Sequence, residues 1–140
     1  MFRVEPYALW LGHAGDCRDV ASLFEAGIRA SVQLAIEEPP VALPRDFIVV
    51  RIPLYDGSDN SADNLQLAVN TVQQLLTSKT PTLVSCGAGM SRSPAIAAFA
   101  LARIENRTPA QSLEMIQSRH GTDVSATLWH DLQTCLNWTK

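Results

Sequence analysis

The chain has 140 residues, a formal net charge of -3 and a hydrophobic content of 46%, values that are ordinary for a globular protein. They predict one domain, residues 1–140, and give no basic surface for nucleic acid or an anionic membrane. No apolar run approaches the ~20 residues that a membrane helix needs, and the first residues lack the pattern of a secretory signal. We therefore expect a cytoplasmic monomer without nucleic-acid or membrane partners.

The cysteines and histidines show no pattern of a disulfide framework or a metal site. Cys17, Cys86 and Cys135 are far apart and odd in number, which favours reduced thiols. The three histidines show no paired spacing on one helix face. We expect no metal and no other cofactor, and whether Cys17 or Cys135 pairs with Cys86 stays open.

Strand-type and helix-type segments alternate along most of the chain. In chain order, we predict strand 7–11, helix 16–26, strands 28–34 and 47–54, helix 62–77, strand 82–85, and helices 94–106, 109–118 and 125–138. Gly27, Pro109 and Ser125 are typical of a helix end, a first helical turn and an N-cap, respectively. This alternation predicts an α/β domain with a mostly parallel central sheet of four to five strands flanked by helices.

The stretch TLVSCGAGMSRSPAIAAFALA, residues 82–102, contains a strand, a small-residue loop and an apolar helix. At such a point anions bind, because the first amides of the helix are unpaired and its dipole is positive there. Glycine and alanine let the backbone curl so that successive N–H groups surround one oxyanion. Arg92 then holds two phosphate oxygens in a bidentate fork. The predicted phosphate-binding residues are Gly87, Ala88, Gly89, Met90, Ser91 and Arg92.

Cys86 lies at the end of the strand, within this predicted cradle. The field that holds phosphate also stabilises a thiolate, so we expect Cys86 to act as a nucleophile at neutral pH. Attack on phosphorus would form a cysteinyl-phosphate and split hydrolysis into two displacements. Ser93 is expected to donate a hydrogen bond to the sulfur when it leaves phosphorus.

A phosphate ester also needs a proton for its departing oxygen, which a carboxylic acid near the strand ends can supply. Asp56 follows the strand DFIVVRIPLYD and opens the loop GSDNSAD, whose composition permits movement over a substrate. Asp59 is the alternative acid. Asp63 fits better in the first turn of the next helix.

These residues resemble the cysteine-dependent protein tyrosine phosphatases, and specifically the small dual-specificity phosphatases. The signature of that family is HCxxGxxRS, and its counterpart in this chain is SCGAGMSRS. The resemblance covers nearly the whole chain and implies one catalytic domain over residues 1–140. It assigns Cys86 as nucleophile, Arg92 as phosphate binder, Ser93 as helper of intermediate breakdown and Asp56 as general acid and then base. The implied activity is metal-independent hydrolysis of phosphoproteins, on phosphotyrosine and also phosphoserine or phosphothreonine.

Two positions depart from the family pattern. Ser85 stands where the family has a histidine before the cysteine, and VSATLW stands where the family often has a Pro-Asn pair opening the last helix. Two alternatives are left open. One is a catalytically weak phospho-residue binding module (a pseudophosphatase), although such modules usually lose Cys, Arg or Asp. The other is a phosphatase for a non-protein phosphate ester, which the absence of cations from residues 87–91 disfavours for polyanionic headgroups.

Overall fold

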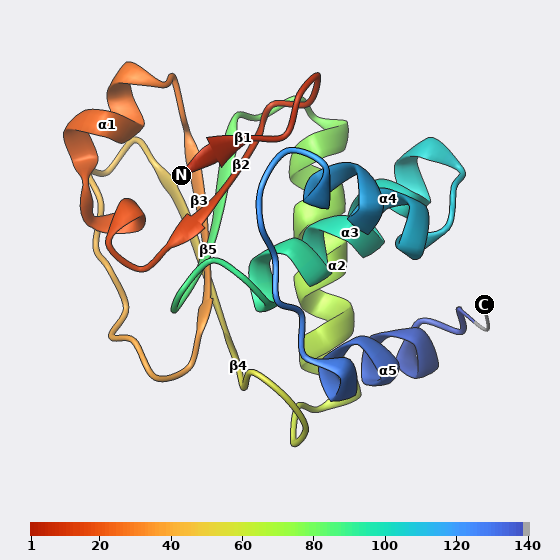
Figure 1. Ribbon diagram of the computed structural model, residues 1–140. Helices are drawn as coiled ribbons and strands as arrows, with labels where there is room; N and C mark the ends of the chain where they lie inside the picture. The colour runs from red at the N-terminus through yellow and green to blue at the C-terminus, as the bar shows by residue number, and fades with distance from the viewer. Residues whose placement is uncertain (139–140) are drawn as a thin grey trace.

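The computed structural model describes residues 1–138, which form an α/β fold around a five-stranded sheet (Figure 1). The strands are β1 (Phe2–Arg3), β2 (Leu9–His13), β3 (Ala30–Ala35), β4 (Ile48–Leu54) and β5 (Thr82–Cys86). Their order is β1-β2-β5-β3-β4, in which β1 is antiparallel to β2 and the other pairs are parallel. The predicted fold class, with a mostly parallel sheet of four to five strands, is therefore confirmed.

Helices cover both faces of this sheet (Figure 1). They are the 3-10 helix η1 (Asp16–Arg18) and the α-helices α1 (Val20–Glu25), α2 (Ala62–Thr77), α3 (Arg92–Glu105), α4 (Pro109–Gln117) and α5 (Ala126–Cys135). Helices α2 to α5 lie on one face, over the larger hydrophobic core, while α1 lies on the other. A smaller apolar cluster beneath α1 includes Cys17, Leu23, Ile28 and Leu83. None of the helices among residues 1–138 is long and apolar enough to cross a membrane.

The two central strands are buried along their whole length. Every residue of β3 and of β5 is buried, as expected for parallel strands covered by helices on both faces. Because β5 pairs with β3 and β3 pairs with β4, the carboxyl ends of all three strands lie at one edge of the sheet. The loops after these strands are therefore brought together at that edge.

Helix α3 is buried on all sides over its first three turns. Its residues from Arg92 to Ala102 are all buried, and its alanines allow close approach of the sheet and of α2 and α4. The Phe99 ring packs 4.7 Å from the Trp129 ring of α5, between ring centroids. The first turn of α3 is thereby fixed directly behind the loop that follows β5.

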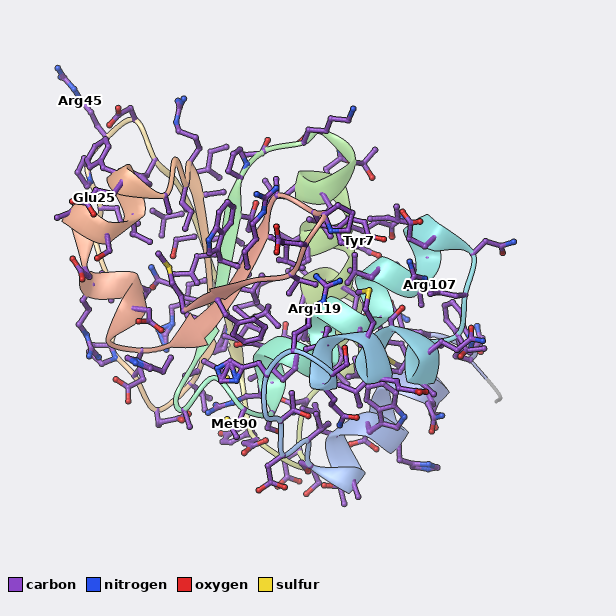
Figure 2. All side chains as sticks on the ribbon, turned by 45° about the horizontal axis from the view of Figure 1, so that its top comes forward. Tyr7, Glu25, Arg45, Met90, Arg107 and Arg119 are labelled. Atoms are coloured by element: carbon purple, nitrogen blue, oxygen red, sulfur yellow. The ribbon has the colours of Figure 1, made fainter. Side chains whose placement is uncertain are left out.

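Two arginines attach the helical layer to the turn between β1 and β2 (Figure 2). Arg107, after α3, donates to the hydroxyl of Tyr7 at 3.1 Å, and Arg119, after α4, donates to the carbonyl oxygen of Glu5 at 2.7 Å. Met90, in the loop after β5, lies away from both arginines in the same view. These contacts therefore tie down a part of the molecule other than the strand-end edge.

Several predicted boundaries at the N-terminal end are wrong. The predicted strand 7–11 begins two residues early, and β1 has no predicted counterpart because two residues are too short to form a pattern. The predicted helix 16–26 is divided into η1 and α1 by Asp19. Asp19 has non-helical dihedrals and its carboxylate accepts from the amide of Ser22 at 3.2 Å, so it caps a new helix instead of continuing the first.

Helix α3 begins at Arg92, two residues before the predicted start at Pro94. Proline lacks only an amide that needs no partner in the first turn, so it fits at the third helical position as well as at the first. Helix α5 ends at Cys135, three residues before its predicted end, whereas its N-cap at Ser125 is confirmed by a bond from the amide of Leu128. The capping of α4 by Thr108 and Pro109 is also confirmed.

Candidate active site

The loop of residues 87–91 joins the end of β5 to the start of α3 and packs against the end of β2. The amide of Ala14 donates to the carbonyl of Gly87 at 3.1 Å. Gly89 has a φ of +75°, and a Cβ added there would lie 2.8 Å from the carbonyl carbon and oxygen of Gly12. Only glycine is compatible with both this conformation and this approach. The tight curl expected of the small residues in this loop is therefore present.

Cys86 ends β5 and borders an open cavity of about 390 Å³ at the strand-end edge. Its exposed fraction is 3%, so Cys86 is buried where it borders the cavity. The cavity is also bordered by Glu37, Asp56, Ala88, Met90, Ser91, Arg92 and Asp123. Cys86, Arg92 and Asp56, which the sequence predicts as catalytic, thus border one cavity although they come from two distant segments.

The Arg92 guanidinium is 4% exposed and is held by two partners. Nη1 donates to Oε1 of Glu37 at 2.6 Å and to the carbonyl oxygen of Leu54 at 2.8 Å. Nη2 donates to Oε2 of Glu37 at 2.5 Å. Nε has no hydrogen-bond partner among the described residues.

An arginine side chain carries five N–H donors, of which these contacts use three. The two that remain are the single hydrogen on Nε and the second hydrogen on Nη2, which lie along one edge of the planar group. A buried donor without a partner is costly, so a vacant edge at the border of a cavity indicates a ligand with two acceptor oxygens. Glu37 and Leu54 therefore orient Arg92 so that the edge for an oxyanion stays free.

The Glu37–Arg92 pair also affects the titration of both groups. The hydrogen bonds from Arg92 hold the pKa of the Glu37 carboxyl below its ordinary value, against a smaller opposing effect of burial. The same bonds raise the pKa of Arg92, with further contributions from Cys86 and Asp56. Arg92 therefore remains a fixed cation in the cavity, as oxyanion binding requires.

Asp56 lies just after β4, in a turn that Asn60 closes. The side-chain amide of Asn60 donates to the carbonyls of Tyr55 at 2.9 Å and Gly57 at 3.3 Å, and its oxygen accepts from the amide of Tyr55 at 2.8 Å. Asp56 itself accepts a 2.6 Å hydrogen bond at Oδ1 from the hydroxyl of Ser91. The loop that the sequence predicts as mobile is thus tied at both its own turn and the loop after β5.

The other candidates for the acid and helper roles occupy different positions. Asp59 is exposed, has a left-handed φ of 75° and does not border the cavity. Asp63 lies in the first turn of α2, as predicted. Ser93 is fully buried in the first turn of α3, and its hydroxyl has no hydrogen-bond partner among residues 1–138, the sulfur of Cys86 included.

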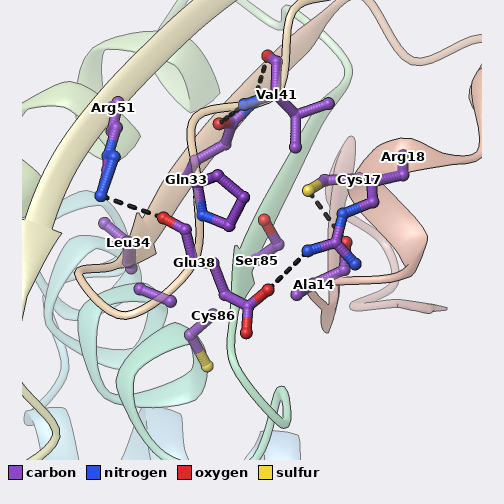
Figure 3. Close-up of a pocket in the computed structure, with 12 residues that line it drawn as sticks. Ala14, Cys17, Arg18, Gln33, Leu34, Glu38, Val41, Arg51, Ser85 and Cys86 are labelled. Atoms are coloured by element: carbon purple, nitrogen blue, oxygen red, sulfur yellow. Dashed lines mark hydrogen bonds and ion pairs between the residues drawn. The ribbon is translucent and has the colours of Figure 1, made fainter.

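A second cavity, of about 10 Å³, lies behind Cys86 on the face of the sheet that carries α1 (Figure 3). Ser85, which replaces the histidine of the family pattern, lines it together with Cys17. The volume suffices for about one water molecule. The Arg18–Glu38 ion pair also borders it. The hydroxyl of Ser85 and this small cavity therefore occupy the place of the family's imidazole, while β5 continues through Ser85 as a regular strand.

The three cysteines are free thiols. Cys17 donates to the carbonyl of Ala14 at 3.1 Å, and the sulfur of Cys86 points away from it (Figure 3). Burial raises the pKa of the Cys135 thiol above its ordinary value, which disfavours reactivity there. Neither Cys17 nor Cys135 is therefore paired with Cys86, and reduced thiols are present as expected.

Three contacts at the site involve residues that sequence reasoning did not single out for a functional role. Glu37 follows β3 by two residues, and its position after a strand adjacent to β5 is the signal that would have found it. The amide of Asp123 donates to the carbonyl of Met90 at 2.8 Å, and the amide of Ser125 donates to the hydroxyl of Ser91 at 2.9 Å. These two contacts use backbone amides, so no pattern of side chains in the sequence predicts them.

Comparisons with known proteins agree with this geometry. A family model described as "Polymorphic toxin system, DSP-PTPase phosphatase" matches residues 13–105, and no curated protein matches the sequence. Human DUSP28 is similar in structure, with a TM-score of 0.84 and 24% identity over 98% of this chain and 96% of that one. The human tyrosine phosphatase-like serine/threonine/tyrosine-interacting protein has a TM-score of 0.79 and 19% identity over 96% and 94%. The Orf virus tyrosine phosphatase OH1 has a TM-score of 0.69 and 24% identity over 95% and 83%.

Proposed function

The chain belongs to the DSP-PTPase phosphatase family of polymorphic toxin systems, and we propose that it is a metal-independent phosphomonoester hydrolase acting through a cysteinyl-phosphate. The observation that carries the proposal is the unpartnered edge of Arg92, buried at a cavity that Cys86 also borders. Residues 1–140 are proposed to form one catalytic domain, of which the last two residues lie outside the described part.

In the first step the Cys86 thiolate attacks phosphorus and the bond from phosphorus to the ester oxygen breaks. Nε and Nη2 of Arg92 hold two equatorial oxygens, and the backbone amides of residues 87–91 hold the negative charge that develops on them. The departing oxygen takes a proton from the carboxyl group of Asp56. The products of this step are the free alcohol or phenol, the cysteinyl-phosphate and an Asp56 carboxylate.

In the second step a water molecule attacks the cysteinyl-phosphate while Asp56 accepts a proton from it. The phosphorus–sulfur bond breaks, and inorganic phosphate and the Cys86 thiolate are formed. The unpartnered hydroxyl of Ser93 is proposed to turn toward the departing sulfur, which would stabilise the thiolate. Both half-reactions therefore balance without a metal ion or any other cofactor.

We propose phosphoproteins as substrates, on phosphotyrosine first and also on phosphoserine or phosphothreonine. Among residues 1–138, Arg92 is the only lysine or arginine that borders the cavity, whereas Glu37, Asp56 and Asp123 also border it. Such a site offers no second cation to a polyanionic headgroup, which disfavours that kind of non-protein ester. The Orf virus protein of similar fold is a tyrosine phosphatase with triple substrate specificity, so the assay should extend beyond phosphotyrosine.

The test is hydrolysis of para-nitrophenyl phosphate by the wild-type chain, with reductant and a metal chelator, beside the Cys86→Ser variant. We expect turnover by the wild type only. When the substrate carries ³²P, rapid acid quenching should trap the label on the wild-type protein. Phosphopeptides with one phosphotyrosine, phosphoserine or phosphothreonine, and a soluble phosphoinositide, then rank the substrate classes. Equal turnover by Cys86→Ser would contradict the proposed nucleophile.

A phospho-residue binding module is the second candidate. It is favoured by Ser85 in place of the family histidine and by the similar fold of a human protein described as phosphatase-like and interacting. A folded wild-type chain that binds a phosphopeptide but releases no phosphate would support this candidate. Catalysis is favoured over this binding role because one cavity is bordered by Cys86, Arg92 and Asp56.

A further inference from the structure

The hydroxyl of Ser91 joins three segments that are far apart in the sequence. Ser91 belongs to the loop before α3, Asp56 to the turn after β4, and Ser125 to the N-cap of α5. Ser91 donates to Oδ1 of Asp56 at 2.6 Å and accepts from the amide of Ser125 at 2.9 Å. Ser91 is 6% exposed, so the residue that joins these segments is itself buried.

The direction of both hydrogen bonds is fixed by chemistry. A backbone amide can only donate, so the hydroxyl oxygen of Ser91 must accept from Ser125. Its single proton is then free for Asp56, and the short distance is typical of a hydroxyl that donates to a carboxyl oxygen. Ser125 thus orients Ser91, and Ser91 in turn orients Asp56.

This arrangement determines which oxygen of Asp56 carries the acidic proton. Because Oδ1 already accepts a hydrogen bond from Ser91, the neutral carboxyl group carries its own proton on Oδ2. That proton passes to the ester oxygen as the phosphorus–oxygen bond breaks. When Asp56 later accepts a proton from water, Oδ2 is again the free oxygen, and the bond to Ser91 remains in both steps.

We propose, on the basis of the function proposed above, that Ser91 is a positioning residue that presents Oδ2 of Asp56 to the leaving group. Its side chain acts through Asp56, whereas its backbone belongs to the predicted phosphate cradle. Ser125 serves this role with its amide, and its side chain is already engaged in capping α5. The position of Asp56 is thereby fixed by the loop after β5 and by the start of α5 together.

The test compares two aryl phosphates that differ in their need for an acid. The para-nitrophenolate group departs without much protonation, whereas the phenolate of phenyl phosphate is a strong base and needs the proton. We expect Ser91→Ala to lower the phenyl phosphate kcat about tenfold more than the para-nitrophenyl phosphate kcat, the effect of one hydrogen bond to an ionisable group. Ser91→Thr keeps the hydroxyl and should restore most of the ratio.

Two controls separate positioning of Asp56 from damage to the loop. The inhibition constant of inorganic phosphate should change less than about threefold in Ser91→Ala, because the backbone amides and Arg92 are unchanged. In an Asp56→Asn background, Ser91→Ala should add no further loss on phenyl phosphate, since residues that act as a unit are not additive. If Ser91→Ala does not fold, Ser91→Cys, measured with reductant, offers only a weak donor of similar size and should show the same ratio.

The outcomes are distinct for the two proposals. An equal loss on both esters, or a full further loss in the Asp56→Asn background, would overturn the role of Ser91 alone. Absence of turnover of both esters by the folded wild-type chain would overturn the proposed hydrolase function, and the role of Ser91 with it. A selective loss on phenyl phosphate that Ser91→Thr restores would establish the role.

Discussion

The floor and the rim of the candidate site are built in different ways. The floor consists of Cys86, loop 87–91 and Arg92, which are contiguous in sequence and lie between a buried strand and a buried helix. The rim consists of Glu37, Asp56 and the Ser125 amide, which come from three other segments. The residues of the floor therefore come from one short stretch of sequence, whereas those of the rim are brought together only by the complete fold.

This difference indicates where the site can tolerate change. In the floor, Cys86, Ser91 and Arg92 are buried, and the loop packs against the end of β2, so a substitution there affects the chemistry directly. Glu37 and Asp56 are exposed side chains that contact the floor through a few hydrogen bonds. We expect floor substitutions to have larger effects than rim substitutions.

The largest effect is expected at the nucleophile. Cys86→Ser should lower kcat on para-nitrophenyl phosphate by more than about 10⁴-fold, because a serine hydroxyl is not ionised in the same field. Binding of a phosphopeptide, measured by calorimetry, should be retained because the cradle is unchanged. Cys17→Ser, a matched control at a buried thiol on the other face of the sheet, should change kcat by less than about twofold if the protein folds.

The next largest effect is expected at the arginine of the floor. Arg92→Lys keeps the charge but removes the two-donor edge, so kcat/KM should fall by about 10²–10³-fold. The matched control is Arg103→Lys near the end of α3, where Arg103 contacts Asn70 and Gln73, and it should be within about twofold of the wild type. Steady-state assays on one aryl phosphate measure both, and similar losses in the two variants would contradict the assignment.

At the rim, Asp56→Asn should lower kcat on phenyl phosphate by about 10²-fold, as expected for loss of a general acid. Para-nitrophenyl phosphate, whose leaving group needs less protonation, should be affected less. Asp59→Asn is the control; if it, and not Asp56→Asn, causes the selective loss on phenyl phosphate, the acid role belongs to Asp59.

The smallest effect is expected at Glu37, which contacts Arg92 and not the reacting atoms. Glu37→Gln should lower kcat/KM about tenfold, because a neutral amide can accept only part of the guanidinium fork. Arg92 lowers the pKa of Glu37 in the folded state. The pair therefore stabilises the fold at pH values above the unfolded-state pKa of Glu37, about 4.3. This contribution is lost as the pH falls through the lower pKa that Glu37 has in the folded state.

Thermal unfolding of the wild type and Glu37→Gln at several pH values measures this contribution. The wild type should have the higher Tm at pH 7, and the difference should shrink as the pH falls below about 4. Glu38→Gln, at a neighbouring glutamate that pairs with Arg18 instead, provides the control for activity. A Tm difference that is constant with pH would show that the Glu37–Arg92 pair is not its source.

The central elements of the fold follow from local sequence patterns. The strand at 82–85 and the helix at 62–77 are predicted within one residue, because continuous apolar runs and a capped amphipathic segment are strong local signals. Two of the errors lie where a single residue decides the local structure. Asp19 caps a new helix where the periodicity alone predicts a continuous one, and Pro94 is accepted inside the first turn of α3.

The sequence by itself therefore determined the α/β class and which residues form the floor, because strand, glycine-containing loop, cysteine and arginine are adjacent in the chain and act over short range. Only the tertiary structure brought Glu37 to the outer edge of the Arg92 guanidinium and the amide of Ser125 to the hydroxyl of Ser91. These contacts join residues 55 and 34 positions apart, and the second uses a backbone amide that every residue except proline carries. Their position depends on strand order and helix packing, which no short stretch of sequence encodes.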